Sequence, residues 1–146
     1  MRRATIKSFA ELGVTTVQDV SAPVMSLSGG QRQAVAVARS AMWAKRVIFL
    51  DEPTAALGVV QTRRVLDLIR QIRDKGLGVV LITHTLPDVI DVADRIEVLR
   101  FGRRTATFDR ADATVELLVS AITGVYSNID VAQPTDVTEL DVGAGR

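Results

Sequence analysis

A chain of 146 residues with 18 basic and 17 acidic side chains has the size of one domain and almost no net charge to attract nucleic acid or an anionic membrane. It contains no cysteine, which excludes disulfide bonds and thiolate metal sites and fits a cytoplasmic protein. The purest apolar runs, 47–50 and 79–82, are far shorter than the ~20 residues of a membrane-spanning helix, so any membrane association has to come through a partner.

Two helices are predicted ahead of the first strand. Apolar residues recur at helical spacing over 6–10 and predict a short helix that ends near Gly13. Small and apolar residues over 34–41 follow the same period. They predict a longer helix from Gly29 to about Trp43.

Two apolar strands flank the next helix. Residues 47–50 are rich in strand-forming side chains and precede two carboxylates, a pattern typical of a strand buried on both faces of a parallel sheet. A one-sided apolar pattern over 65–72 predicts a helix that ends at Gly76, and residues 79–83 form a second strand of the same kind. This alternation predicts a parallel α/β sheet with right-handed crossovers.

A helix and a hairpin are predicted next. Thr85, followed three positions later by Asp88, is a helix-start signal for residues 86–93. Residues 95–100 and 105–108 flank a four-residue turn, which predicts an antiparallel hairpin.

A final helix is predicted between Thr114, at its N-cap position, and Gly124, at its end. Residues 125–146 lose the apolar periodicity and turn acidic, so we expect a loose tail there.

The segment Ser28-Gly29-Gly30-Gln31 is a candidate anion-binding site at a helix start. The two glycines allow close backbone approach, and the free amides and the helix dipole favour negative charge. Ser28 and Gln31 add side-chain donors. An ordinary helix cap has the same composition, so a purely structural role is an equal alternative.

Asp51, Glu52 and His84 are the candidate catalytic and metal-binding residues. They follow neighbouring strands, and ligands of parallel sheets bind beyond the carboxyl ends of the strands. One carboxylate can hold Mg²⁺ through water while the other polarises a nucleophilic water. The alternative is that the two acids mark the exit of a strand into solvent and that the histidine is an ordinary surface residue.

Taken together, these motifs resemble the ATPase subunit of ATP-binding cassette (ABC) transporters. Residues 27–39 resemble the signature motif, and 47–52 resemble the Walker B motif with its catalytic glutamate. Residues 55–58 occupy the D-loop position, and 83–84 resemble the switch-histidine segment. The D-loop region and residues 86–89 are similar to those of bacterial ribose- and fructose-type sugar importers.

The resemblance implies an α/β P-loop NTPase-like fold and an ATP site shared between two subunits. Asp51 would assist Mg²⁺, Glu52 would activate the attacking water, and His84 would contact the γ-phosphate. Residues 28–31 would hold the phosphate of the nucleotide bound to the partner.

The sequence departs from the family pattern at two places. Gly58 stands where the D-loop usually carries aspartate, and no P-loop of the form Gly-x-x-x-x-Gly-Lys-Ser/Thr occurs. The resemblance divides the chain into the end of a helical subdomain (1–27), the C-terminal part of the ATPase core (28–124) and the acidic tail (125–146).

These observations predict an ATP-binding and ATP-hydrolysing subunit of a sugar import system, present as a fragment without a P-loop and inactive alone. A second ATPase subunit and membrane permeases would be its partners, at the inner face of the plasma membrane. A non-catalytic module that donates its signature motif or docks to a permease, or an inactive remnant, is the alternative. DNA-repair ATPases share some motifs, but their heptad-rich segments are absent from 1–25, and the net charge of +1 argues against a nucleic-acid partner.

Overall fold

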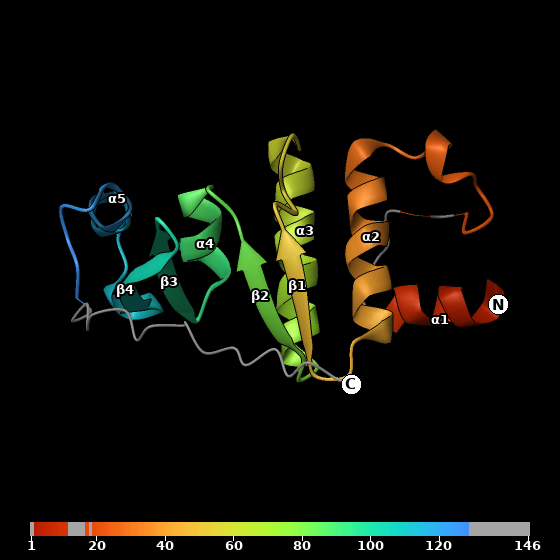
Figure 1. Ribbon diagram of the computed structural model, residues 1–146. Helices are drawn as coiled ribbons and strands as arrows, with labels where there is room; N and C mark the ends of the chain where they lie inside the picture. Colours follow the sequence, from red (N-terminus) through yellow and green to blue (C-terminus); the bar gives the residue numbers. More distant parts are fainter. Residues whose placement is uncertain (1, 12–16, 18, 129–146) are drawn as a thin grey trace, which may run out of the picture. The chain divides into compact units, whose positions relative to one another are not determined.

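The computed structural model describes residues 2–11, 17 and 19–128 (Figure 1). The chain divides into two compact units, Met1–Ala93 and Asp94–Arg146, each of which is described by itself. Their α/β architecture, with a small parallel sheet and a later hairpin, confirms the predicted fold class.

Helices and strands alternate in the first unit, as the apolar periodicity predicts. The elements are α1 (Arg2–Glu11), α2 (Gly29–Trp43), β1 (Val47–Asp51), α3 (Val59–Asp74), β2 (Gly78–Ile82) and α4 (Leu86–Val92). Gly13, the predicted end of α1, lies outside the described residues. Thr85 precedes α4 as predicted, although its side chain makes no capping hydrogen bond.

The core of the first unit lies where α2 and α3 run side by side and pack against β1 (Figure 1). The apolar stripe of α3, predicted over 65–72, faces inward, and Val65 and Ile72 are fully buried. The buried apolar residues of this core are Phe9, Ala34, Val37, Ala38, Ala41, Ile48, Leu50, Val65, Leu66, Leu68, Ile69 and Ile72.

The parallel sheet of the first unit buries only one of its faces. β1 pairs with β2 in parallel, with Phe49 opposite Val80 and Asp51 opposite Ile82. Ile48 points into the core, whereas Phe49 is 68% exposed. The prediction that the strands are buried on both faces is therefore wrong for the described part of the chain, in which the helices cover one side of the sheet only.

The second unit is built on an antiparallel hairpin. β3 (Arg95–Arg100) pairs with β4 (Arg103–Asp109), and α5 (Val115–Thr123) follows. The connecting turn contains two residues, Phe101 and Gly102, rather than the four expected, and both have positive φ. The strongly twisted turn that such residues form fits the twist of the two strands, which allows pairing to continue to the end.

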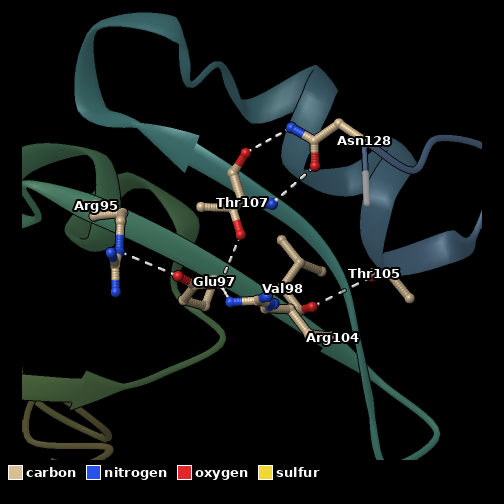
Figure 2. A network of polar contacts seen from close by, with 7 residues as sticks. All are labelled: Arg95, Glu97, Val98, Arg104, Thr105, Thr107 and Asn128. Carbon is tan, nitrogen blue, oxygen red and sulfur yellow. Dashed lines mark hydrogen bonds and ion pairs between the residues drawn. The ribbon is translucent and has the colours of Figure 1, made fainter. Parts of the chain in front are cut away.

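The ends of α5 agree with the sequence prediction. The Thr114 hydroxyl accepts a hydrogen bond from the amide of Leu117, and Gly124 ends the helix with φ of 86°. The segment after α5 is attached to β4, as Figure 2 shows: Asn128 donates its side-chain amide to Thr107 O at 2.6 Å and accepts from Thr107 N at 2.9 Å. Residues 129–146 lie outside the described part, so the loose tail stays a prediction.

The exposed face of the hairpin also carries an ionic network. The Glu97 carboxylate accepts a hydrogen bond from the Thr107 hydroxyl at 2.7 Å and pairs with the guanidinium groups of Arg95 and Arg104 (Figure 2). These are surface interactions, which typically contribute less than about 1 kcal/mol each.

Candidate functional site

The start of α2 is a complete capping box. The Ser28 hydroxyl accepts a hydrogen bond from the Gln31 amide at 3.3 Å, and the Gln31 side-chain oxygen accepts one from the Ser28 amide at 2.8 Å. The Arg32 guanidinium donates a hydrogen bond to Leu27 O, which holds the residue before the N-cap Ser28 in place. This cap uses the Ser28 and Gln31 side chains as acceptors and leaves the first helical amides at the positive end of the helix dipole.

The two glycines of this segment have different surroundings. A Cβ atom built on Gly29 would approach nothing closer than Leu57 Cδ2 at 3.9 Å, an ordinary contact. A Cβ built on Gly30 would collide with Gln61 of α3. A small side chain would therefore fit at Gly29, whereas the space beside Gly30 is already filled.

Glu52 and His84 meet at the carboxyl ends of β1 and β2. The Glu52 amide donates to Ile82 O at 2.8 Å, which extends the pairing of the two strands by one bond. The Glu52 carboxylate accepts hydrogen bonds from three groups in the turn that follows β2: His84 N at 3.1 Å, His84 Nδ1 at 2.6 Å and the Thr83 hydroxyl at 3.0 Å. Since a carboxylate can only accept here, Nδ1 carries the hydrogen.

These hydrogen bonds favour the ionised carboxylate. The side-chain hydrogen bond from His84 lowers the pKa of Glu52, partly opposed by desolvation, and the donors of Thr83 and the backbone act in the same direction as His84. The Glu52 side chain is 34% exposed and that of His84 82% exposed, so the far edge of the imidazole is open to a ligand.

Asp51 lies at the end of β1 with an exposed side chain. Within the described residues, no group of three or more acidic or histidine side chains is arranged to hold a metal ion by itself. A carboxylate such as Asp51 suits Mg²⁺ as one ligand among waters and phosphate oxygens, which is how proteins usually bind this ion.

A tightly turned loop follows Glu52 and is anchored in the core. Glu52 and Ala56 have φ of 45° and 58°, values that cost energy for residues other than glycine and that occur often at functional sites. The Thr54 hydroxyl, in a residue 7% exposed, donates at 2.7 Å to the carboxylate of Asp88, 9% exposed, on α4. This buried bond fixes the loop relative to the turn that carries His84.

The structure brings some of the predicted site residues into contact and shows further side chains that support them. Glu52 and His84 are brought into contact as the shared sheet edge predicts, whereas Ser28 forms its hydrogen bond with Gln31 at a separate helix start. The sequence did not predict the contacts of three supporting side chains: Thr83, named only as part of the switch-histidine segment, Asp88, named only in a helix-start signal, and Gln61. Thr83 adjoins the histidine, which was a usable signal, but the contacts of Asp88 and Gln61 depend on packing between distant segments.

Comparisons with known proteins point to one family. The family model described as "ABC transporter" matches residues 2–55. The chain is 48% identical over 124 residues to the fructose import ATP-binding protein FrcA of Rhizobium meliloti, an alignment that covers 85% of this chain and 48% of the relative. It is 39% identical over 124 residues to the ribose import ATP-binding protein RbsA 1 of Burkholderia thailandensis, covering 85% of this chain and 24% of the relative. The chain thus spans less than half the length of either protein.

The fold comparison agrees. An ATP-binding cassette of an ABC transporter, solved in an ADP conformation, superposes with a TM-score of 0.68 at 24% identity, covering 82% of this chain and 47% of the other. At that identity the superposition establishes the shared fold alone. Within the described residues, no helix is long and apolar enough to cross a membrane.

Proposed function

We propose that this chain, which belongs to the ABC transporter family, contributes the signature, Walker B and switch-histidine part of an ATP-hydrolysing site in a sugar import system. The observation that carries the proposal is the contact between Glu52 and His84 at the carboxyl ends of two neighbouring parallel strands. Glu52 accepts hydrogen bonds from the turn after β2, which is not expected of a carboxylate that only marks the exit of a strand into solvent.

Glu52 is the proposed general base for the attacking water. A glutamate carboxylate is ionised at neutral pH, and the contacts with Thr83 and His84 fix the direction of both oxygens. The His84 Nδ1 hydrogen is held by Glu52, so Nε2 faces outward. When the ring carries both protons, Nε2–H can donate to a phosphate oxygen.

ATP and Mg²⁺ fit the groups that the chain exposes. Asp51 offers an exposed carboxylate to Mg²⁺, and the N-terminus of α2, where Gly29 is exposed, offers the positive end of a helix dipole to a phosphate. Bound Mg-ATP would supply the reacting phosphoryl group and the charge that stabilises its transfer. The chain's own part is to orient water at Glu52 and to present the helix dipole at residues 28–31.

These 146 residues contain no P-loop, so the groups described here complete a site only with phosphate-binding groups from outside this segment. We propose that the partners are a second ATPase subunit, which holds the nucleotide, and membrane permeases, which would place the chain at the inner face of the plasma membrane. The names of the relatives, fructose and ribose import ATP-binding proteins, support sugar as the transported class.

A second candidate function is donation of the signature segment alone, without catalysis by this chain's carboxylates. The capping box favours it, because Ser28 and Gln31 complete the helix start with no residue from a P-loop. An oriented donor that acts on transition-state charge is typically worth about 3–4 kcal/mol.

A rescue experiment tests the part of the proposal that concerns the signature segment. The chain is mixed with a full-length ribose or fructose import ATPase whose own signature serine has been replaced, and phosphate release is measured. We expect partial rescue, and we expect Ser28→Arg to abolish it by filling the phosphate position. Ser40→Arg, at an exposed serine of the same helix, is the matched control and should rescue like the unmodified chain. No rescue by a chain that circular dichroism and size exclusion show to be folded would leave an inactive remnant as the better description.

A further inference from the structure

Gln61, in the first turn of α3, fills the space beside two glycines of the proposed site. A Cβ built on Gly30 would lie 2.6 Å from Gln61 Cγ and 2.9 Å from Gln61 Cβ. A Cβ built on Gly58 would lie 2.8 Å from Gln61 Oε1. Real Cβ atoms essentially never approach other heavy atoms within 3.0 Å, so a side chain at Gly30 would require the stem of Gln61 to shift, whereas at Gly58 only the movable amide end of Gln61 would have to give way.

The requirement at Gly30 comes from crowding and not from backbone conformation. Neither Gly29 nor Gly30 has a positive φ, and both belong to α2, where alanine is normally the more stable residue. Gly29 has its nearest neighbour, Leu57 Cδ2, at 3.9 Å. The two adjacent glycines therefore form a matched pair, of which only Gly30 contacts Gln61.

Gln61 connects two parts of the site that are far apart in the sequence. Gly30 belongs to the start of α2, whereas Gly58 ends the loop that begins at Glu52. That loop is short. Near its first residue it is held by the bond from Glu52 N to Ile82 O and by the buried bond of Thr54, and at its other end Gly58 O accepts a hydrogen bond from Thr62 N. Because the loop is short and hydrogen-bonded, we expect a displacement of the backbone at Gly58 to displace Glu52 as well.

We propose that Gln61 is a positioning residue that couples the start of α2 to the Glu52–His84 pair. The functional meaning of this coupling rests on the proposed function, in which the two groups serve different nucleotides. The coupling itself is a property of this chain and can be measured without nucleotide.

His84 is the only histidine of the chain, so its ring C2 proton gives a single proton NMR line that reports on the contact with Glu52. We expect Gly30→Ala to shift this line by more than its width and to lower the thermal midpoint by about 3–5 °C. Gly29→Ala, the matched control, should do neither. Gln61→Gly removes both colliding atoms, Cβ and Cγ, so adding Gly30→Ala to this variant should shift the histidine line no further and lower the midpoint no further.

Three results would overturn the proposal: equal effects of Gly29→Ala and Gly30→Ala, a lowered midpoint with an unchanged histidine line, or a further shift of that line when Gly30→Ala is added to Gln61→Gly. If Gly30→Ala does not fold, Gln61→Ala alone keeps the test decisive, because it deletes the contact without adding atoms. We expect it to shift the histidine line, and an unchanged line would refute the coupling. Because no nucleotide or partner is involved, this result is independent of the rescue experiment.

Discussion

Replacing Phe49 by alanine tests whether one face of the β1–β2 sheet is open to water. Truncating a fully buried phenylalanine costs about 3–5 kcal/mol, but Phe49 is 68% exposed, so about a third of that, or about 1 kcal/mol, should be lost. Its neighbour Ile48 is 4% exposed on the opposite face, and Ile48→Ala should cost about 2–5 kcal/mol. Two adjacent residues of one strand thus differ in expected cost by a factor of two or more.

Urea unfolding, followed by circular dichroism, gives both values. The open face also predicts that the chain binds a hydrophobic dye or aggregates, and that Phe49→Ala reduces dye fluorescence whereas Ile48→Ala does not. A cost for Phe49→Ala as large as that for Ile48→Ala would refute the reasoning, because it would mean that another surface covers Phe49 in solution. Such a result from a monomeric chain would further imply a closed core that the described residues do not show.

Two other predictions concern the site. The pKa of Glu52 is lowered from 4.5, so the stability it contributes is present above pH 4.5 and is lost as the pH falls through the lower folded value. Urea midpoints measured between pH 6 and 3 should therefore fall more for the unmodified chain than for Glu52→Gln, and equal slopes would contradict the assignment. Asp88→Ala leaves the buried Thr54 hydroxyl without its acceptor and should lower the free energy of unfolding by about 1–3 kcal/mol. Asp91→Ala, which breaks an exposed ion pair with Arg70, should cost less than about 1 kcal/mol, and a reversed order would be evidence against the buried anchor.

The sequence predicted those elements whose local signals agree with their packing. The period of α3 over 65–72, the Ser28 and Thr114 caps and the left-handed Gly124 each reflect interactions within one helix, which is why their positions could be read directly. The hairpin was found, but its turn was expected to be longer, because a phenylalanine in a left-handed turn position is an unusual choice.

Most contacts between segments that are far apart in the sequence could not be predicted. An apolar run such as 47–50 looks the same whether one or both faces of the strand are covered, so the exposure of Phe49 could not be deduced. The contact of Glu52 with His84 could be predicted, because parallel topology brings the two strand ends together. The contact of Thr54 with Asp88 and that of Gln61 with Gly30 and Gly58 depend on how loops and helices pack, for which no local pattern exists.

The start of α2 and the Glu52–His84 pair need different additional groups to act on a nucleotide. The pair can activate water for hydrolysis only beside a γ-phosphate, and the sequence has no P-loop to hold one there. The start of α2 is capped by the Ser28 and Gln31 side chains, so the N-terminus of this helix is formed without a P-loop and can meet a phosphate that another subunit holds. The open face of the sheet, around Phe49, plays no part in that cap. Donation of the signature segment is therefore the proposed activity that needs the fewest groups from outside this chain, and the comparison of Ser28→Arg with Ser40→Arg addresses it directly.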